Sequence, residues 1–417
     1  MSFLTSLTRM WLTRSWRPFT FKNEYDRILP YAECGSLGLY VHIPFCRSIC
    51  SFCPYCKVPY DKDLCSRYID ALIREIHMVG SRETGRKEVT SLYFGGGTPA
   101  LAADRIGEII RALEDHFIIT DGIGLELHPD NVRPEILVKL KEAGVTRISI
   151  GIQSFGDRYQ KILGRKAVDP GALKAALETV PFDTVSMDFI FALPGQSFED
   201  LRSDIDTAFA CGANHVAVYP FIDFTFTDSK VPVMKKKEKR ALLDAVTQYC
   251  LGKGYTRSSI WTFSSEPDAV YSSMTRENFI GFGCSATSLF KDQFKINTFD
   301  VGAYCQRIDA GEPATSLTIR FTKRQRMVYW LFWTAYSTRV RPEDFESFFG
   351  VSLESMYGKE LYLAEKLGFV TKKEGAFEMT LKGAFYYHYY ENFYTLAYID
   401  KMWGIMRKEA FPEKILL

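Results

Sequence analysis

The chain has 417 residues, which is long for one ordinary core and predicts a large first domain followed by a smaller one. Hydrophobic residues make up 47% and charged residues 24%, a balance that is typical of a globular protein and excludes a largely disordered chain. The 52 basic and 50 acidic residues leave a net charge of +2, which does not favour nucleic acid as a partner. We therefore expect a small-molecule partner.

The N-terminal segment, residues 1–21, is mildly amphipathic and carries three arginines. It has neither the long apolar core nor the cleavage site of a secretory signal. No window approaches the roughly 20 apolar residues that cross a bilayer. We expect a cytoplasmic protein, for which peripheral membrane contact stays open.

One theme repeats from about residue 36 to residue 230, an apolar strand-like run followed by an amphipathic helix-like stretch such as 62–79. Six strands are predicted, at 38–43, 89–94, 123–128, 146–151, 184–192 and 214–221. The alternation predicts a parallel sheet of right-handed βαβ units, either a barrel or a doubly wound sheet. Both architectures place ligands at the carboxyl ends of the strands.

Polar and small residues follow or end each predicted strand. In chain order they are the cysteines after the first strand, Gly95, Gly96, Gly97 and Thr98 after the second, Glu126 on the third, Gln153 at the end of the fourth, Asp188 on the fifth and Tyr219 on the sixth. Because the carboxyl ends of parallel strands share one rim, we expect a single site to use them all.

The pattern changes after residue 228. A glycine-rich stretch occupies 279–290, and helices followed by a short two-stranded turn begin at about residue 320, which suggests a winged-helix-like module. The expected division is a leader over 1–35, a core barrel over 36–230, an accessory region completing the site over 231–315, and a helical, winged-helix-like end over 316–417.

Four cysteines crowd into one short stretch. Cys46, Cys50 and Cys53 form CxxxCxxC, and Cys56 adds a further CxxC step. Zinc sites usually assemble two separated pairs, and no second CxxC lies downstream. A tight run of thiolates on one loop suits an iron-sulfur cluster. If three thiolates bind a four-iron cluster, one iron stays open for another ligand.

These residues resemble a known family. CxxxCxxC after a first barrel strand is the signature of radical S-adenosylmethionine (radical SAM) enzymes, and "YVHIPFC", "CSFC", "YFGGGTP", "GIQSF", "KILGRK", "MDFIFALPGQS" and "HVAVYPF" resemble its oxygen-independent coproporphyrinogen III dehydrogenase branch. The resemblance covers about 36–230. It implies an α/β fold with a partial (β/α)6 TIM-type barrel, a 4Fe-4S cluster and S-adenosylmethionine. It also implies a flavodoxin- or ferredoxin-type electron donor, and cleavage of the cofactor to a 5′-deoxyadenosyl radical.

The resemblance assigns a role to each matching residue. Cys46, Cys50 and Cys53 would bind the cluster, and the turn from Gly95 to Thr98 would let the backbone approach the methionine amino group. The remaining cofactor contacts would be Tyr40 at the sulfonium, Phe52 shielding the cluster and packing on adenine, Glu126, the pair Gln153 and Arg165 on ribose and carboxylate, Asp188 on the ribose hydroxyls, and Tyr219. Tyr40 and Glu126 are the predicted catalytic residues. Capping or salt-bridge roles stay open for each polar residue taken alone.

The chain also departs from the family pattern. It has a short leader, and CPYC stands where relatives have CxC, which leaves propionate decarboxylation open and Cys56 without a role. We expect a planar cyclic substrate of tetrapyrrole type, oxidised as by a coproporphyrinogen III oxidase. The alternatives are a class C methyltransferase or cyclopropanase using two S-adenosylmethionine molecules on an sp² carbon, and a heme chaperone. The aromatic tail over 384–404 fits either a core helix or a lid over a hydrophobic substrate.

Overall fold

The computed structural model describes residues 3–83, 85–229, 231–267 and 277–417. All six predicted strands are present and pair in parallel, in the order in which they occur in the chain. They are β2 (Gly38–Ile43), β6 (Ser91–Gly96), β8 (Ile123–Leu127), β9 (Arg147–Gln153), β10 (Thr184–Phe191) and β11 (His215–Pro220). The predicted α/β fold with a partial TIM-type barrel is thereby confirmed, because every neighbouring pair is joined through a helical crossover.

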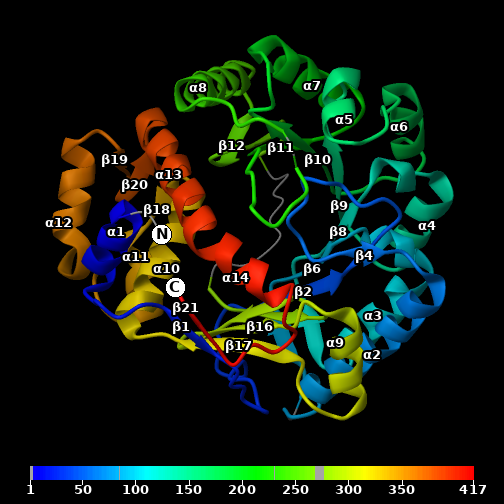
Figure 1. The fold of residues 1–417 in the computed structure, drawn as a ribbon. Helices are drawn as coiled ribbons and strands as arrows, with labels where there is room; N and C mark the ends of the chain where they lie inside the picture. The colour runs from blue at the N-terminus through cyan, green and yellow to red at the C-terminus, as the bar shows by residue number, and fades with distance from the viewer. Residues whose placement is uncertain (1–2, 84, 230, 268–276) are drawn as a thin grey trace.

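Helices cover the outer face of this parallel sheet (Figure 1). They are α2 (Lys62–Gly80), α3 (Ala103–Glu114), α4 (Pro134–Glu142), α5 (Asp157–Ile162), α6 (Pro170–Leu177) and α7 (Phe198–Ala210), with 3-10 turns η1 (Pro99–Ala102) and η2 (Pro129–Asn131). The helix α2 begins after Asp61, whose side chain accepts a hydrogen bond from the Leu64 backbone. Its Tyr68, Leu72 and Ile76 are buried against the sheet, as the sequence period predicts.

The sheet continues beyond the barrel strands on both sides and has 14 strands among the described residues. Next to β2 lies β14 (Phe279–Phe282), in parallel, followed by the antiparallel strands β15 (Thr287–Leu289), β16 (Gln293–Asn297), β17 (Thr315–Arg320), β1 (Thr20–Lys22) and β21 (Lys414–Leu416). Next to β11 lie β13 (Thr262–Ser264) and β12 (Thr256–Ser259). Segments from both ends of the chain therefore pair with each other within the barrel's own sheet.

Two short strand pairs lie outside the large sheet, β3 (Phe45–Cys46) with β4 (Val58–Pro59) and β5 (Lys87–Val89) with β7 (Phe117–Ile119). The first pair frames the cysteine loop. The remaining helices of this part are α1 (Phe3–Thr13), α8 (Lys236–Gly252) and α9 (Val301–Asp309). Within the described ranges, no helix combines the length and the apolar character that crossing a membrane requires.

The C-terminal part has the order helix, strand, helix, helix, strand, strand, which is the order of a winged helix. These elements are α10 (Lys323–Tyr336), β18 (Arg339–Val340), α11 (Pro342–Phe349), α12 (Leu353–Lys366), β19 (Val370–Lys373) and β20 (Ala376–Met379). They enclose a small core of their own around Trp330 and Phe345. The predicted domain boundaries stay a prediction.

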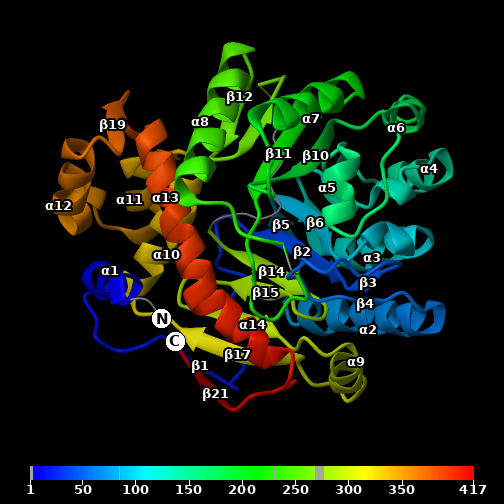
Figure 2. The same cartoon turned by 45° about the horizontal axis from the view of Figure 1, so that its top comes forward.

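The last helices leave this module and return to the barrel. These are α13 (Leu381–Tyr394), the π-helical turn η3 (Thr395–Ile399) and α14 (Asp400–Met406). Figures 1 and 2 show them, in red, crossing in front of the large sheet. Tyr398, Met402 and Met406 are buried in the main core that the barrel strands form. The aromatic tail is therefore partly core, and its far end reaches the rim of the barrel.

Candidate active site

Three cysteines lie together where β2 ends. Cys46 closes the short strand β3, and Cys50 and Cys53 follow on the loop to β4 as half-buried free thiols. The loop is closed by the Tyr60 backbone N–H, which donates to the Cys46 carbonyl oxygen at 2.8 Å. Burial, with a smaller effect of the Cys53 and Cys50 charges, raises the pKa of Cys46 to about 11. The three thiols are thus near enough to influence one another.

The cysteine loop fits an iron-sulfur cluster. In the described part of the chain, no three His, Cys, Asp or Glu side chains are grouped as ligands of a single metal ion would be. A 4Fe-4S cluster does not require its ligands to be grouped around one ion, because each thiolate binds its own iron atom. A Cβ on Gly97 would lie 2.6 Å from the Phe45 carbonyl oxygen, so glycine allows the turn after β6 to lie against the loop. Thr98 Oγ1 donates to Cys46 Sγ at 3.8 Å. The donor set and this close turn suit the cluster.

Glu126 faces the same turn from β8. Its Oε1 accepts from the Tyr93 hydroxyl at 2.9 Å and its Oε2 accepts from the Gly96 backbone N–H at 3.1 Å. Burial raises the pKa of Glu126, and these two hydrogen bonds oppose the shift. A Cβ on Gly95 would lie 3.0 Å from the Tyr40 ring and 3.2 Å from the Glu126 carboxyl carbon. The bare turn therefore leaves the carboxylate in contact with backbone donors.

Tyr40 and His42 lie on β2 below the cysteines. The Tyr40 hydroxyl bonds to His42 Nδ1 at 3.0 Å, and its ring stacks on Tyr93 with centroids 6.3 Å apart. His42 Nε2 lies 3.0 Å from the Cys56 carbonyl oxygen and 3.3 Å from Ser285 Oγ. His42 is therefore buried but hydrogen-bonded, and it joins the first barrel strand to the glycine-rich loop after β14.

Gln153 and Arg165 lie side by side at the end of β9. A Cβ on Gly151 would lie 2.9 Å from Gln153 Nε2 and 4.0 Å from Arg165 Nη1. Gln153 has a left-handed backbone with φ of 72°, which non-glycine residues rarely adopt. Burial raises the pKa of Cys50, and the Arg165 charge partly opposes this shift. The pair is thus next to the cysteine loop.

Asp188 lies on β10 and faces the barrel interior. It accepts hydrogen bonds from Ser149 Oγ at 2.9 Å and from Ser186 Oγ at 3.4 Å. Burial raises its pKa to about 7, and the charge of Glu126 adds to the shift. Asp188 pairs in register with Ala217 of β11, and Tyr219 shares the face of Ala217 because alternate residues of a strand point the same way. Tyr219 is 41% exposed, so it lies at the open end of this face.

Phe52 is the predicted residue that points away from these polar groups. It packs, half-buried, on an apolar cluster that includes Leu163, Leu193 and Phe221. The other candidates, on β2, β6, β8, β9 and β10, share the interior face of the barrel at its carboxyl end.

Cys56 has surroundings unlike those of the other three cysteines. Its buried thiol donates to the Phe299 carbonyl oxygen at 3.2 Å and lies 3.8 Å from Cys284 Sγ, whose own thiol donates to Thr298 at 3.1 Å. The Cys56 thiol is therefore directed toward Cys284 and Phe299 in the accessory region. These contacts support leaving it out of the cluster ligands.

Sequence reasoning missed several residues that support the site. Tyr93 and Ser149 donate hydrogen bonds to the two carboxylates. Tyr55 of the CPYC insertion lies close enough to Glu126 and Asp188 to interact with their charges. The alternation of side chains along a strand could have identified Tyr93 and Ser149. Tyr93 lies two positions before Gly95 and pairs with Tyr40, and Ser149 pairs with Glu126. No local pattern indicates the direction of Tyr55.

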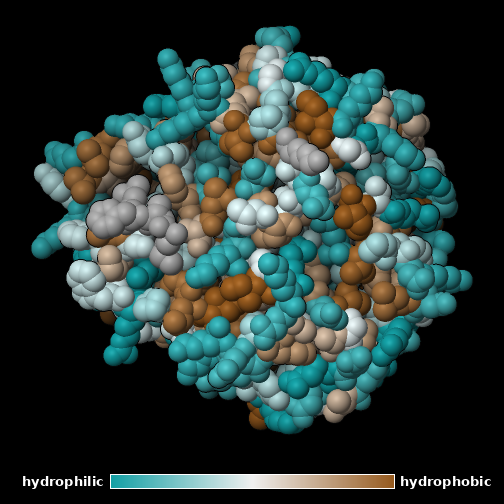
Figure 3. All heavy atoms as spheres, in the orientation of Figure 1, coloured by the Kyte–Doolittle hydropathy of each residue, from teal (hydrophilic) through white to brown (hydrophobic). Residues whose placement is uncertain are grey.

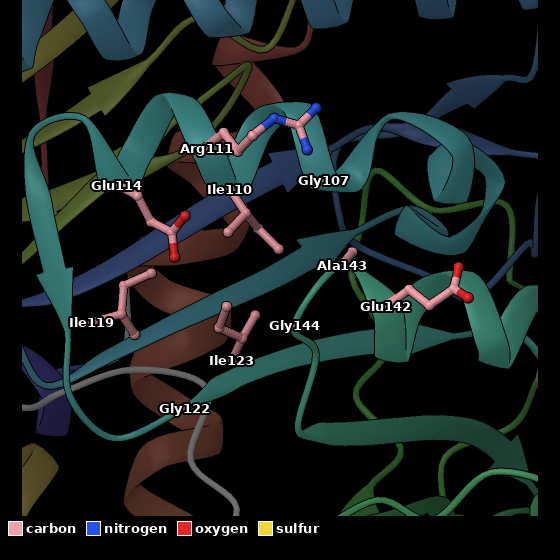
Figure 4. Close-up of a pocket in the computed structure, with 10 residues that line it drawn as sticks. All are labelled: Gly107, Ile110, Arg111, Glu114, Ile119, Gly122, Ile123, Glu142, Ala143 and Gly144. Carbon is pink, nitrogen blue, oxygen red and sulfur yellow. The ribbon is translucent and has the colours of Figure 1, made fainter.

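Two hollows lie at opposite ends of the strands. One, of about 430 Å³, opens beside the cysteine loop and is lined by Ser51, Ile162, Pro194, Asp228, Val231 and Pro232. The other, of about 390 Å³, lies between α3 and α4 at the start of β8, where Arg111 and Glu142 line it (Figure 4). Barrel enzymes use the carboxyl ends of their strands, and only the first of these two hollows lies at that end.

Comparison with known proteins agrees with this geometry. Residues 40–208 match the model of the radical SAM superfamily. The chain therefore contains a radical SAM domain, and its cysteine loop, glycine turn and carboxylates all lie within that match or at its edge.

Individual relatives sharpen this class without deciding the activity. The chain is 28% identical over 367 residues to the heme chaperone HemW of Bacillus subtilis, covering 82% of this chain and 95% of the relative. It is 27% identical over 307 residues to an oxygen-independent coproporphyrinogen III oxidase of Pseudomonas aeruginosa, covering 67% of each. The solved structure of coproporphyrinogen III oxidase (HemN) from Escherichia coli aligns with a TM-score of 0.75 and 22% identity, over 91% of this chain and 97% of that one. This last likeness shows the fold.

Proposed function

We propose that this protein is a radical SAM enzyme that acts on a planar cyclic substrate of tetrapyrrole type. The observation that carries the proposal is the meeting of three half-buried thiols with Glu126 and the Gly96 backbone on one barrel rim. When reduced, a 4Fe-4S cluster with bound S-adenosylmethionine supplies a 5′-deoxyadenosyl radical. The protein supplies the ligands Cys46, Cys50 and Cys53 and the surroundings that orient the cofactor.

The chain's own residues divide the remaining work. Gly95 to Thr98 form a turn without side-chain obstruction, on which an amino group can bind backbone carbonyls and Glu126. Arg165 offers a planar guanidinium to a carboxylate, next to Gln153. Asp188 offers a carboxylate to hydroxyl groups. Burial raises the pKa values of Glu126 and Asp188 and so disfavours their charged forms. A bound cationic ligand would oppose this effect.

The test is an anaerobic turnover assay. The protein is reconstituted with iron and sulfide, reduced with dithionite, and given S-adenosylmethionine, after which 5′-deoxyadenosine and S-adenosylhomocysteine are quantified. We expect 5′-deoxyadenosine, absent when any one of Cys46, Cys50 or Cys53 is changed to Ala. S-adenosylhomocysteine formed alongside it would assign the methyltransferase alternative. No 5′-deoxyadenosine from a fully loaded cluster would contradict the enzyme proposal.

A heme chaperone is the second candidate function. It is favoured by the extent of the match to HemW, which covers 95% of that relative. A chaperone should bind heme in a fixed ratio while consuming little S-adenosylmethionine. A heme titration run beside the turnover assay separates the two candidates, because an enzyme of the first kind consumes cofactor in proportion to substrate.

A further inference from the structure

The C-terminal helix α14 lies directly against the cysteine loop. The Trp403 ring centroid is 6.2 Å from that of Tyr55, and Arg407 Nη2 donates to the Pro54 carbonyl oxygen. Pro54 and Tyr55 are the two residues between Cys53 and Cys56. Figures 1 and 2 show α14, in red, in front of the large sheet. Pro54 and Tyr55 of the cysteine loop thus contact Arg407 and Trp403 near the C-terminus.

The position of α14 is fixed by a buried carboxylate. Asp400, its first residue, accepts from the Thr225 backbone N–H and from Thr225 Oγ1, both at 2.7 Å. Asp400 is 6% exposed. The preceding turn η3 is π-helical, a form that is found mostly as short bulges, frequently at functional sites. The bulge and the Asp400 contacts set the direction in which the next turn presents Trp403 and Arg407.

Aromatic rings gather at this junction, where the planes of Tyr55 and Trp403 are tilted by 50°. Trp403 stacks on Phe224 with centroids 6.2 Å apart and planes 9° apart, and lies 5.9 Å from Phe299. The two supporting rings are buried, whereas Tyr55 is 55% exposed. In the space-filling view of this side, apolar areas lie among the charged ones (Figure 3). Rings held rigidly from behind and open in front suit stacking with another flat ring.

A cation borders this aromatic surface. Arg407 Cζ lies 4.7 Å from the Phe226 ring centroid and 5.8 Å from that of Phe299. In the described ranges no carboxylate forms an ion pair with Arg407; its hydrogen bond goes to the Pro54 carbonyl. A guanidinium has five N–H donors, so it can bind a carboxylate and keep that contact. The site therefore offers aromatic rings and one positive charge at their edge.

We propose that Tyr55, Trp403 and Arg407 form a binding subsite for a flat aromatic ring system that carries a carboxylate side chain. The ring lies against Tyr55 and Trp403, and the carboxylate accepts hydrogen bonds from Arg407. This inference rests on the proposed function, since it places that enzyme's substrate beside the cysteine loop. It also gives the CPYC insertion and the aromatic tail a shared role.

Coproporphyrin III, a flat ring with carboxylate side chains, is the probe, titrated into the full-length protein and followed by the change in its absorption and fluorescence. Tyr55→Ala and Arg407→Gln should each raise its Kd about tenfold, the effect of losing an aromatic contact or a charge-assisted hydrogen bond. The tetramethyl ester of the probe, in the same detergent buffer, should bind wild type and Arg407→Gln within roughly twofold of each other, since it offers no charge to the guanidinium. Both changes are at exposed positions, and thermal unfolding checks that the variants fold.

Matched controls are Trp16→Ala, Tyr362→Ala and Arg17→Gln, exposed residues of the same kinds in other regions. Equal weakening by these controls, unchanged Kd in Tyr55→Ala and Arg407→Gln, or no saturable binding to wild type would each overturn the subsite. The proposed function is read separately, from 5′-deoxyadenosine released by the wild-type enzyme. Binding that the variants weaken, without 5′-deoxyadenosine, would support the subsite and contradict the enzyme proposal. Formation of 5′-deoxyadenosine without such binding would support the enzyme proposal and contradict the subsite.

Discussion

The barrel half of the chain and its C-terminal segment contribute to one rim in different ways. In the barrel half, the candidate residues lie on successive strands or on the segments that follow them, and short-range patterns predict both the strands and these residues. In the segment from 381 to 417, the contact that matters joins Arg407 to Pro54, which are 353 positions apart. The comparison shows that residues at the strand ends can be predicted together from the sequence. The packing of α14 against the cysteine loop cannot be predicted in this way.

Removing a cluster ligand should have the largest effect and tests the barrel half. Cys46→Ala should lower 5′-deoxyadenosine formation below about one hundredth of wild type, because the three thiolates act as a unit. Cys56→Ala should keep its iron and sulfide, since its thiol contacts Phe299 and Cys284 instead. Iron, sulfide and product are measured on both variants. Loss of iron in Cys56→Ala equal to that in Cys46→Ala would contradict the assignment of three ligands.

Releasing α14 should come next and tests the C-terminal segment. Asp400→Asn loses charge-assisted hydrogen bonds to Thr225 in a buried position, so the free energy of unfolding should fall by about 2 kcal/mol. Urea unfolding measures the loss, with the exposed Asp223→Asn as control. Hydrogen exchange should rise in 400–406. If exchange rises equally over all helices, α14 has no separate dependence on Asp400.

Changing the carboxylate on β8 should have a smaller effect on cofactor affinity. Glu126→Gln places an amide where two donors, the Tyr93 hydroxyl and the Gly96 N–H, now point, and should weaken S-adenosylmethionine binding about tenfold. Tyr93→Phe removes one supporting bond and should weaken it less. Equilibrium dialysis with labelled cofactor measures both, and Glu142→Gln at the opposite end of the strands is the control. Unchanged affinity in Glu126→Gln would remove Glu126 from the cofactor site.

A pH dependence is expected from Asp188. Burial raises its pKa to about 7 from 3.8, so the folded state binds more protons than the unfolded state between these values. The Asp188 contribution to the free energy of unfolding therefore falls as the pH rises from 4 to 7, by up to about 1.4 kcal/mol per pH unit. In Asp188→Asn this contribution is absent, so the difference in unfolding free energy, variant minus wild type, should rise over this window. A flat difference in urea unfolding of the metal-free protein would mean that Asp188 is charged throughout.

Most of the barrel could be predicted because its signals are local. The six parallel strands lie within a few residues of their predicted bounds, and the helix predicted over 62–79 is α2. Glu126 was predicted as a site residue, but its hydrogen-bond partner Tyr93 was not. Choosing among several nearby donors depends on the twist and register of neighbouring strands, which the spacing of residues in one strand does not contain.

The sequence by itself determined the succession of strands and helices, the three-thiol motif, and the set of residues at the strand ends, because each follows from periodicity or from spacing within one element. Only the tertiary structure decided that Cys56 contacts Cys284, that both chain ends join the barrel's sheet, and that α14 meets the cysteine loop. These are contacts between segments hundreds of positions apart. They depend on how packed surfaces fit after folding, and no local pattern records that fit.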